Sequence, residues 1–162
     1  MAEVDTARAL LIMALTDLLD AQAALAERLP VVLAHASDAG FRRLVADDRD
    51  GSAGRRAALE RMIRDLGGDP DDAPCIWMRA VLDDADNDAD TIAAGPLRDI
   101  ALIGALRKGK QAERVSYETA MALAERLGLT DAAGTLTVIR GEEQAADDEL
   151  AGLLRELCAG VS

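Results

Sequence analysis

Apolar side chains recur along residues 97–127 by alternating steps of three and four, which is the spacing of one face of an α-helix. The stripe on this face comprises Ile103, Leu106, Lys110, Glu113, Tyr117, Ala120, Ala124 and Leu127. Lys110 and Glu113 stand in its middle, where the pattern calls for apolar residues. Because burying either charge alone is costly, both must be paired, ligated or hydrated. The pattern therefore predicts a long bundle helix with a polar centre.

Three other segments carry a similar stripe, which is apolar at both ends and polar in the middle. The four predicted helices span residues 5–34, 39–66, 97–127 and 131–158. The polar positions on their stripes are Gln22 in the first, Asp48, Ser52 and Arg55 in the second, Lys110 and Glu113 in the third, and Glu143 in the fourth. Four stripes of this kind predict an all-α four-helix bundle with a buried polar centre.

The second helix contains a stretch that is poor helix material. Residues 46–56 read ADDRDGSAGRR, with two glycines that each cost about 1 kcal/mol relative to alanine in a helix. We expect a local break there. Standard end signals flank the helices: Ser37 or Asp38 and Thr130 or Asp131 as N-caps, and Gly128 just after a helix C-terminus.

The segment between the second and third long helices predicts a crossover with one short helix at residues 75–83. The run DDADNDADT follows from Asp83. A calcium-binding EF-hand loop needs glycine at its sixth and glutamate at its twelfth position, which here are Asp88 and Ala94. We therefore interpret this run as a solvated acidic connector. It lets the third long helix start at the same end of the bundle as the second.

Composition limits the possible partners. The chain has 162 residues, enough for one domain over 1–162, with 18 basic and 30 acidic side chains. A net charge of −12 repels phosphate backbones and anionic lipids, which argues against nucleic acid and membrane partners. Cys75 and Cys158 form no metal or disulfide pattern, and no signal peptide is recognisable. We expect a cytoplasmic protein, with Cys75 as a packed thiol and Trp77 as a core or interface anchor.

Several short stretches, taken in order, resemble the ferritin-like proteins of the bacterial YciE/YciF type, a family long known as a domain of unknown function. The stretches are LTDLLDAQAAL, LGGDP with Cys75 and Met78, LRDIALIGAL with Tyr117, ALAERLGL, and EEQAAD. The resemblance covers almost the whole chain. It implies a ferritin-like four-helix bundle that dimerises and often carries a di-metal centre. The metal-ligand candidates that it implies are Asp50, Glu113, Glu143 and Asp147.

The chain departs from this family at positions where the family has metal ligands. Gln22 stands where the family has a glutamate, Lys110 and Gln111 stand where it has Glu-His, and Asp50 with Ala53 stands where it has a Glu-x-x-His-like pair. A di-metal site needs about four to six anionic or imidazole ligands. The single histidine, His35, lies near a predicted helix end.

Two functional hypotheses follow from these departures. In the first, Lys110 and Arg55 neutralise Glu113 and Glu143, and Gln22, Asp48 and Ser52 complete a metal-free network. The protein would then have no catalytic or cofactor site, and a structural or partner-binding role that the resemblance links to stress, as a homodimer with an unknown protein partner.

In the second hypothesis, the protein is a ferritin-like oxidoreductase or iron-handling protein. It would bind iron or manganese through the reduced ligand set Asp50, Glu113, Glu143 and Asp147. We favour the first hypothesis, because a lysine in the centre competes with metal cations for the same carboxylates.

Overall fold

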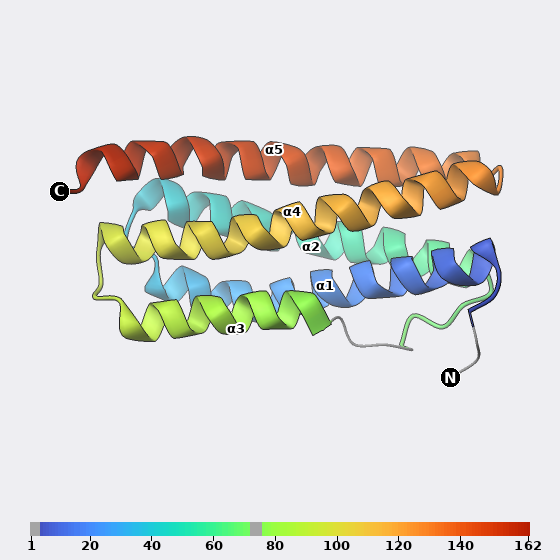
Figure 1. Ribbon diagram of the computed structural model, residues 1–162, viewed down its shortest axis with the longest axis horizontal. Coiled ribbons are helices and arrows are strands. Elements are labelled where there is room, and N and C mark those ends of the chain that lie inside the picture. Colours follow the sequence, from blue (N-terminus) through green and yellow to red (C-terminus); the bar gives the residue numbers. More distant parts are fainter. Residues whose placement is uncertain (1–3, 72–75) are drawn as a thin grey trace.

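The computed structural model describes residues 4–71 and 76–162, and this part of the chain contains five α-helices and no strand. The helices are α1 (Ala7–His35), α2 (Ala39–Asp65), α3 (Ile76–Thr91), α4 (Pro96–Arg126) and α5 (Thr130–Gly160). Figure 1 shows the four long helices side by side, with the shorter α3 on the outside of the bundle. The predicted all-α class is confirmed.

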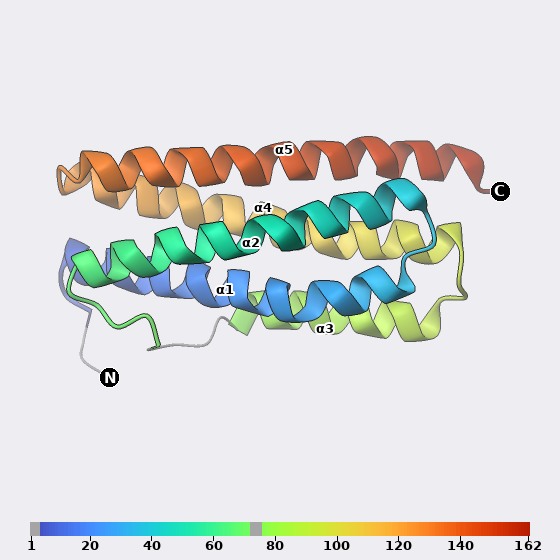
Figure 2. The same ribbon diagram turned by 180° about the vertical axis from the view of Figure 1, so that it is seen from behind.

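The order of the helices in space is that of a ferritin-like bundle. Helices α1 and α2 form one antiparallel hairpin, and α4 and α5 form the other (Figures 1 and 2). Helices α2 and α4 run in the same direction, because the connection between them crosses the length of the bundle and carries α3. Helix α3 packs against α1 and α4. The predicted long crossover with an extra helix is therefore confirmed.

The helix ends follow the predicted signals with one exception. The Asp38 carboxylate caps α2 and accepts a hydrogen bond from a backbone N–H at 2.8 Å. Gly128 has φ +70°, a conformation that favours glycine, and it ends the turn after α4. The predicted capping of α5 by Thr130 or Asp131 is wrong. Helix α5 begins directly after Leu129 and has no side-chain cap.

The predicted break in the second helix is also wrong, because α2 runs without interruption through residues 46–56. Side-chain contacts of Arg55 outweigh the poor helix propensity of this stretch. Gly51 leaves room for the Arg55 side chain, since a Cβ atom at Gly51 would lie 2.6 Å from Arg55 Nη1. The Arg55 guanidinium in turn binds the backbone oxygen and the carboxylate of Asp48, at 2.9 and 2.7 Å. These bonds span the two helical turns between Asp48 and Arg55.

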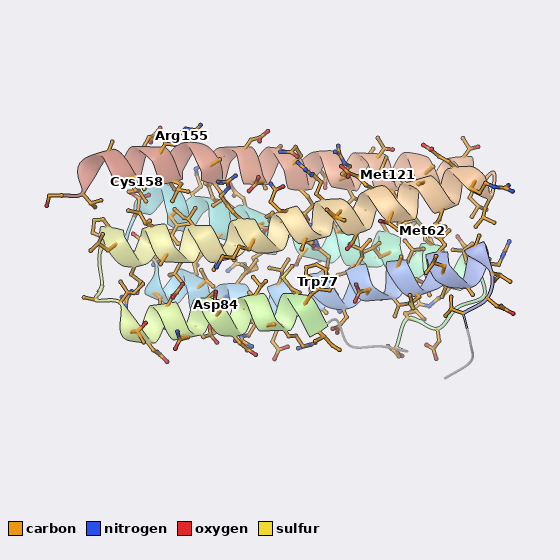
Figure 3. The ribbon with its side chains drawn as sticks, in the orientation of Figure 1. Met62, Trp77, Asp84, Met121, Arg155 and Cys158 are labelled. Carbon is orange, nitrogen blue, oxygen red and sulfur yellow. The ribbon has the colours of Figure 1, made fainter. Side chains whose placement is uncertain are left out.

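The acidic run after residue 83 is helical, which corrects the prediction of a solvated connector after a short helix at 75–83. Helix α3 begins at Ile76 and continues to Thr91. Its inner face buries Met78, Leu82, Ala85 and Ala89. Cations from neighbouring helices pair with its carboxylates: Arg28 contacts Asp83 at 3.0 Å and also Asp86, and Lys108 contacts Asp84 at 3.2 Å. Figure 3 shows Asp84 on α3. The predicted thiol at Cys75 lies outside the described residues.

The apolar core is divided into two clusters, one in each half of the bundle. The first gathers around Leu25, Phe41 and Leu102, and the second around Leu15, Leu59 and Leu136. The polar residues predicted for the middle of each stripe lie between them. Trp77 packs against the first cluster, and its Nε1 donates a hydrogen bond to Asp17 Oδ2 at 2.7 Å. Trp77 therefore fixes the beginning of α3 onto α1 (Figure 3).

Helix α1 is long and apolar enough to cross a membrane when only length and composition are considered. Its most apolar 18-residue window has a mean hydropathy of 1.6. In this fold, 50% of that window is buried inside the bundle. Its apolar stripe packs against α2, α3 and α4, as expected for the core helix of a bundle.

Candidate functional site: the buried polar centre

Six polar side chains from four helices meet in the middle of the bundle, between the two apolar clusters. They are Gln22 from α1, Asp48 and Arg55 from α2, Lys110 and Glu113 from α4, and Glu143 from α5. We call this set the buried polar centre. Each of its side chains is at most 9% exposed, so none of the charges is solvated as it would be at the surface.

Lys110 is the cation around which the carboxylates gather. Its ammonium nitrogen lies 2.7 Å from Asp48 Oδ2 and 4.0 Å from Glu113 Oε2, and it makes a short contact with Glu143 Oε2. Burial alone would lower the pKa of Lys110. The negative charges of Glu143 and Asp48 outweigh that effect and raise the pKa above its ordinary value. Lys110 therefore carries a positive charge at every physiological pH.

Arg55 is the second cation of the centre and links α2 to α5 and α1. Its Nη2 binds Asp48 Oδ1 at 2.7 Å, and its Nε lies 2.8 Å from Glu143 Oε1. The same Nε is 2.9 Å from the side-chain oxygen of Gln22. The Gln22 amide nitrogen donates to Glu113 Oε1 at 2.5 Å and to Glu143 Oε1 at 3.0 Å. Gln22 thus connects Arg55 to the carboxyl groups of Glu113 and Glu143.

The charges of the centre are neutral only when one carboxyl group holds a proton. Asp48, Glu113 and Glu143 are three acids, whereas Lys110 and Arg55 are two cations. Burial and the nearby Glu143 charge raise the pKa of Glu113 to about 8, against the opposing effect of Lys110. At neutral pH Glu113 is therefore mostly protonated. Its neutral form removes the one unmatched negative charge.

Two buried polar atoms, one in the centre and one beside it, have no hydrogen-bond partner among the described residues. They are Glu113 Oε2 and the hydroxyl oxygen of Tyr117, one helical turn further along α4. The Tyr117 side chain is fully buried. Burial, together with the charges of Glu113 and Glu143, raises the pKa of its hydroxyl well above the ordinary value. The Tyr117 hydroxyl is therefore neutral at physiological pH.

The other predicted site residues lie away from this centre. Ser52 is buried, but its hydroxyl donates to the Arg49 backbone oxygen at 2.7 Å and not to the network. The Asp50 side chain is 68% exposed and pairs with Arg49. Asp147 lies one turn beyond Glu143 on α5 and belongs to a separate pair of contacts on the α4 side.

Asp147 is satisfied by residues that the sequence pattern does not single out. Arg107 Nε binds Asp147 Oδ1 at 2.8 Å, and the Gln111 amide binds Oδ2 at 2.6 Å. Gly51 was also not recognised as part of the site, although it makes room for Arg55. The available signal was spacing, since Arg107 and Gln111 are four residues apart on one face of α4, and Gly51 and Arg55 are four apart on α2.

The residues present do not fit a di-metal centre. Within residues 4–71 and 76–162, no group of three acidic, histidine or cysteine side chains is arranged to bind a metal ion. The three carboxylates that do converge surround the Lys110 ammonium instead. Asp50 points to solvent, and both oxygens of Asp147 are occupied. A metal ion would have to displace Lys110 from a buried site, which leaves its charge unpaired.

The fold and its central network define the class of protein: a ferritin-like four-helix bundle whose charged centre is neutralised by its own side chains. Residues 6–160 match the model of a domain of unknown function, DUF892, and the chain belongs to this family. The resemblance noted in the sequence is therefore confirmed.

Proteins similar to the chain include one curated relative and two solved structures. Protein YciF of Escherichia coli (strain K12) is 35% identical over 79 residues, a match that spans 49% of this chain and 48% of that protein. The crystal structure of the E. coli stress protein YciF superposes with a TM-score of 0.91 at 24% identity, over 96% of this chain and 98% of that one.

The second structure is YcfI from Rhodopseudomonas palustris, which has been suggested to be a structural protein. It superposes with a TM-score of 0.87 at 25% identity, over 92% of this chain and 95% of that one. These comparisons extend the agreement in fold to almost the whole chain. The aligned sequence spans about half the length of the curated relative.

Proposed function

We propose that this protein is a metal-independent, ferritin-like member of the DUF892 family with a structural or partner-binding role in the stress response. The observation that carries the proposal is the position of the Lys110 ammonium, which contacts Asp48, Glu143 and, more distantly, Glu113. An internal cation holds the carboxylates that a metal would need. The stress-related role is supported by the similarity to E. coli YciF, which is described as a stress protein.

The chemistry of the centre favours a structural role over a catalytic one. Its cations are paired, and its acids accept bonds from Lys110, Arg55 or Gln22. No activated nucleophile results, because a nucleophile needs an adjacent free base or a lowered pKa. Tyr117 has a raised pKa, and Lys110 is held in its charged form. A network of this kind fixes how four helices fit together.

The proposal includes a cytoplasmic homodimer that binds a further protein. Support for an interface comes from the beginning of α3, where Ile76 is 79% exposed beside the half-buried Trp77. On the neighbouring stretch of α1, Leu10 and Met13 are exposed as well. Aromatic and large apolar side chains in such positions are enriched in protein interfaces.

The test is elemental analysis of protein purified without chelator, followed by titration with iron(II) in air. We expect no stoichiometric iron or manganese and no new absorbance band. The variant Lys110→Arg serves as a matched control, because it keeps the cation and should behave like wild type. About two metal ions per chain with an oxidation band would overturn the proposal. That result would favour the metal-binding oxidoreductase or iron-handling hypothesis, with Glu113 and Glu143 as the first ligands to replace.

A further inference from the structure

A groove between α2 and α5 opens onto one side of the buried polar centre. Its volume is about 340 Å³. Val45, Leu106 and Leu150 contribute to its apolar floor. Figure 2 shows the two helices that border it, α2 and α5, side by side with α4 behind them. We call this cavity the α2–α5 groove.

The rim of the groove is acidic. Asp47 and Asp48 line it from α2, and Glu142 and Glu149 line it from α5. Arg55 of α2 also lines the groove, but its charge is bound to Asp48 and Glu143. Asp48 is already bound to Lys110 and Arg55 in the centre. The other three carboxylates face solvent.

The exposed carboxylates are only weakly neutralised by the chain itself. Arg43 contacts Asp47 and Glu149, both at 3.4 Å and with all three side chains more than half exposed. Exposed pairs at this distance contribute little. Glu142 forms no ion pair with the described residues. The groove therefore combines an apolar floor with unmatched negative charge.

We propose that the α2–α5 groove binds an arginine side chain presented by an apolar segment of a partner protein. The aliphatic stem would pack on the accessible lining formed by Leu44, Ala145 and Ala146, above the buried floor. The guanidinium would reach Glu142 and Glu149. The choice of partner rests on charge complementarity. An acidic rim repels nucleic acid and anionic lipid, whereas an arginine matches both the floor and the rim.

This inference rests on the proposed partner-binding role and gives it a location. It does not depend on whether the centre binds metal. Because the floor and Asp48 belong to the packed core, the groove is held in shape before a partner arrives. A preformed site loses less conformational entropy on binding.

The experiment is an NMR titration of the full-length, ¹⁵N-labelled protein with the peptide acetyl-Ala-Leu-Arg-Leu-Ala-amide. The control peptide carries citrulline, which has the shape of arginine without its charge. We expect shifts confined to the amides of residues 44–48 and 142–150, and roughly tenfold weaker binding of the citrulline peptide. The variant Ala146→Leu narrows the groove and should abolish binding.

A matched pair of double variants distinguishes the effect of the groove carboxylates from that of the protein's overall negative charge. Glu142→Gln with Glu149→Gln should weaken binding roughly fivefold. Glu125→Gln with Asp131→Asn removes the same charge from exposed positions outside the groove and should leave binding unchanged. Equal effects of the two double variants, shifts elsewhere on the surface, or no shifts at all would overturn the inference. Spermidine that binds the groove as tightly as the arginine peptide would also overturn the inference, because it would indicate a site for small amines. Failure of the proposed function would appear separately, in the metal analysis.

Discussion

Lys110 Nζ and Asp48 Oδ2 lie 2.7 Å apart in the middle of the bundle, where the two side chains are 2% and 9% exposed. The contact joins α4 to α2 between the two apolar clusters, to which both helices contribute. The same ammonium also contacts Glu143, so that one charge connects three helices. In an environment with little water, such a charge cannot lose its partners without a large cost.

The first prediction concerns the removal of this charge. Lys110→Met should lower the free energy of unfolding by about 3 to 5 kcal/mol at pH 7, because it leaves Asp48 and Glu143 without their main cation. Urea denaturation followed by circular dichroism measures the change. The comparison variant is Lys108→Met, whose exposed pair with Asp84 should contribute less than about 1 kcal/mol. Equal stability of Lys110→Met and wild type would rule out the network as a determinant of stability.

The second prediction concerns pH. The pKa of Glu113 is about 8 in the folded protein and has an ordinary value of 4.5. Between these values the folded state binds a proton that the unfolded chain does not bind. The Glu113 contribution to stability is therefore greatest below the ordinary pKa and is lost as pH rises to about 8, with a slope of up to about 1.4 kcal/mol per pH unit.

Urea midpoints of wild type and Glu113→Gln, measured from pH 5.5 to 9, isolate this effect. Glutamine resembles the protonated acid, so the variant should gain on wild type as the pH rises to about 8, and the difference should level off above that pH. Parallel curves for the two proteins would show that Glu113 is ionised throughout and that the charge count of the centre is wrong.

The third prediction compares two glycines on the same helix. Gly51→Ala places a methyl group 2.6 Å from Arg55 Nη1, whereas a Cβ atom at Gly54 meets nothing within 4 Å. We expect Gly54→Ala to stabilise the protein by about 1 kcal/mol through helix propensity. Gly51→Ala should instead destabilise it by about 1 to 3 kcal/mol, since Arg55 must leave its partners. Thermal denaturation of both variants checks the sign. If both variants were more stable than wild type, Arg55 would be able to shift without a loss of stability.

The fourth prediction concerns a carboxylate outside the centre. Asp99, at the start of α4, accepts hydrogen bonds from the backbone N–H groups of Ser37 at 2.9 Å and Asp38 at 2.8 Å. Asp99→Ala leaves both donors unpaired and should cost about 2 to 4 kcal/mol. Asp131→Ala, an exposed first-turn acid of α5, is the control and should cost less than about 1 kcal/mol. Chemical denaturation of the two variants gives both values.

The long helices and the position of the polar centre could be predicted from sequence because they depend on periodicity. Lys110, Glu113 and Gln22 occupy stripe positions, and the side chains on either side of them are buried in the apolar clusters. The spacing alone therefore located the layer in which they meet. It also identified Arg55 as a second cation, which the structure places against Glu143.

The errors occurred where contacts between helices outweigh local preference. Helix α2 stays continuous because Arg55, which packs over Gly51, binds Glu143 of α5 and Gln22 of α1, and propensity does not reveal these contacts. Helix α3 extends through its aspartates because its inner face buries Leu82, Ala85 and Ala89 against the bundle. Arg28 and Lys108 pair with carboxylates on its outer side. The resemblance suggested Asp50 as a ligand, but its position in a continuous α2 turns it toward solvent. Such pairings depend on side-chain placement across the bundle.

The shared ammonium of Lys110 also restricts how this sequence can evolve. Replacing Lys110 or Arg55 with an uncharged residue leaves buried carboxylates unmatched, at a cost that is a large part of the roughly 5 to 15 kcal/mol by which domains are stable. Accepted changes must therefore come in compensating sets. Once a chain has acquired such a buried ion-pair network, it cannot return to a set of metal ligands through a series of single mutations that each preserve stability.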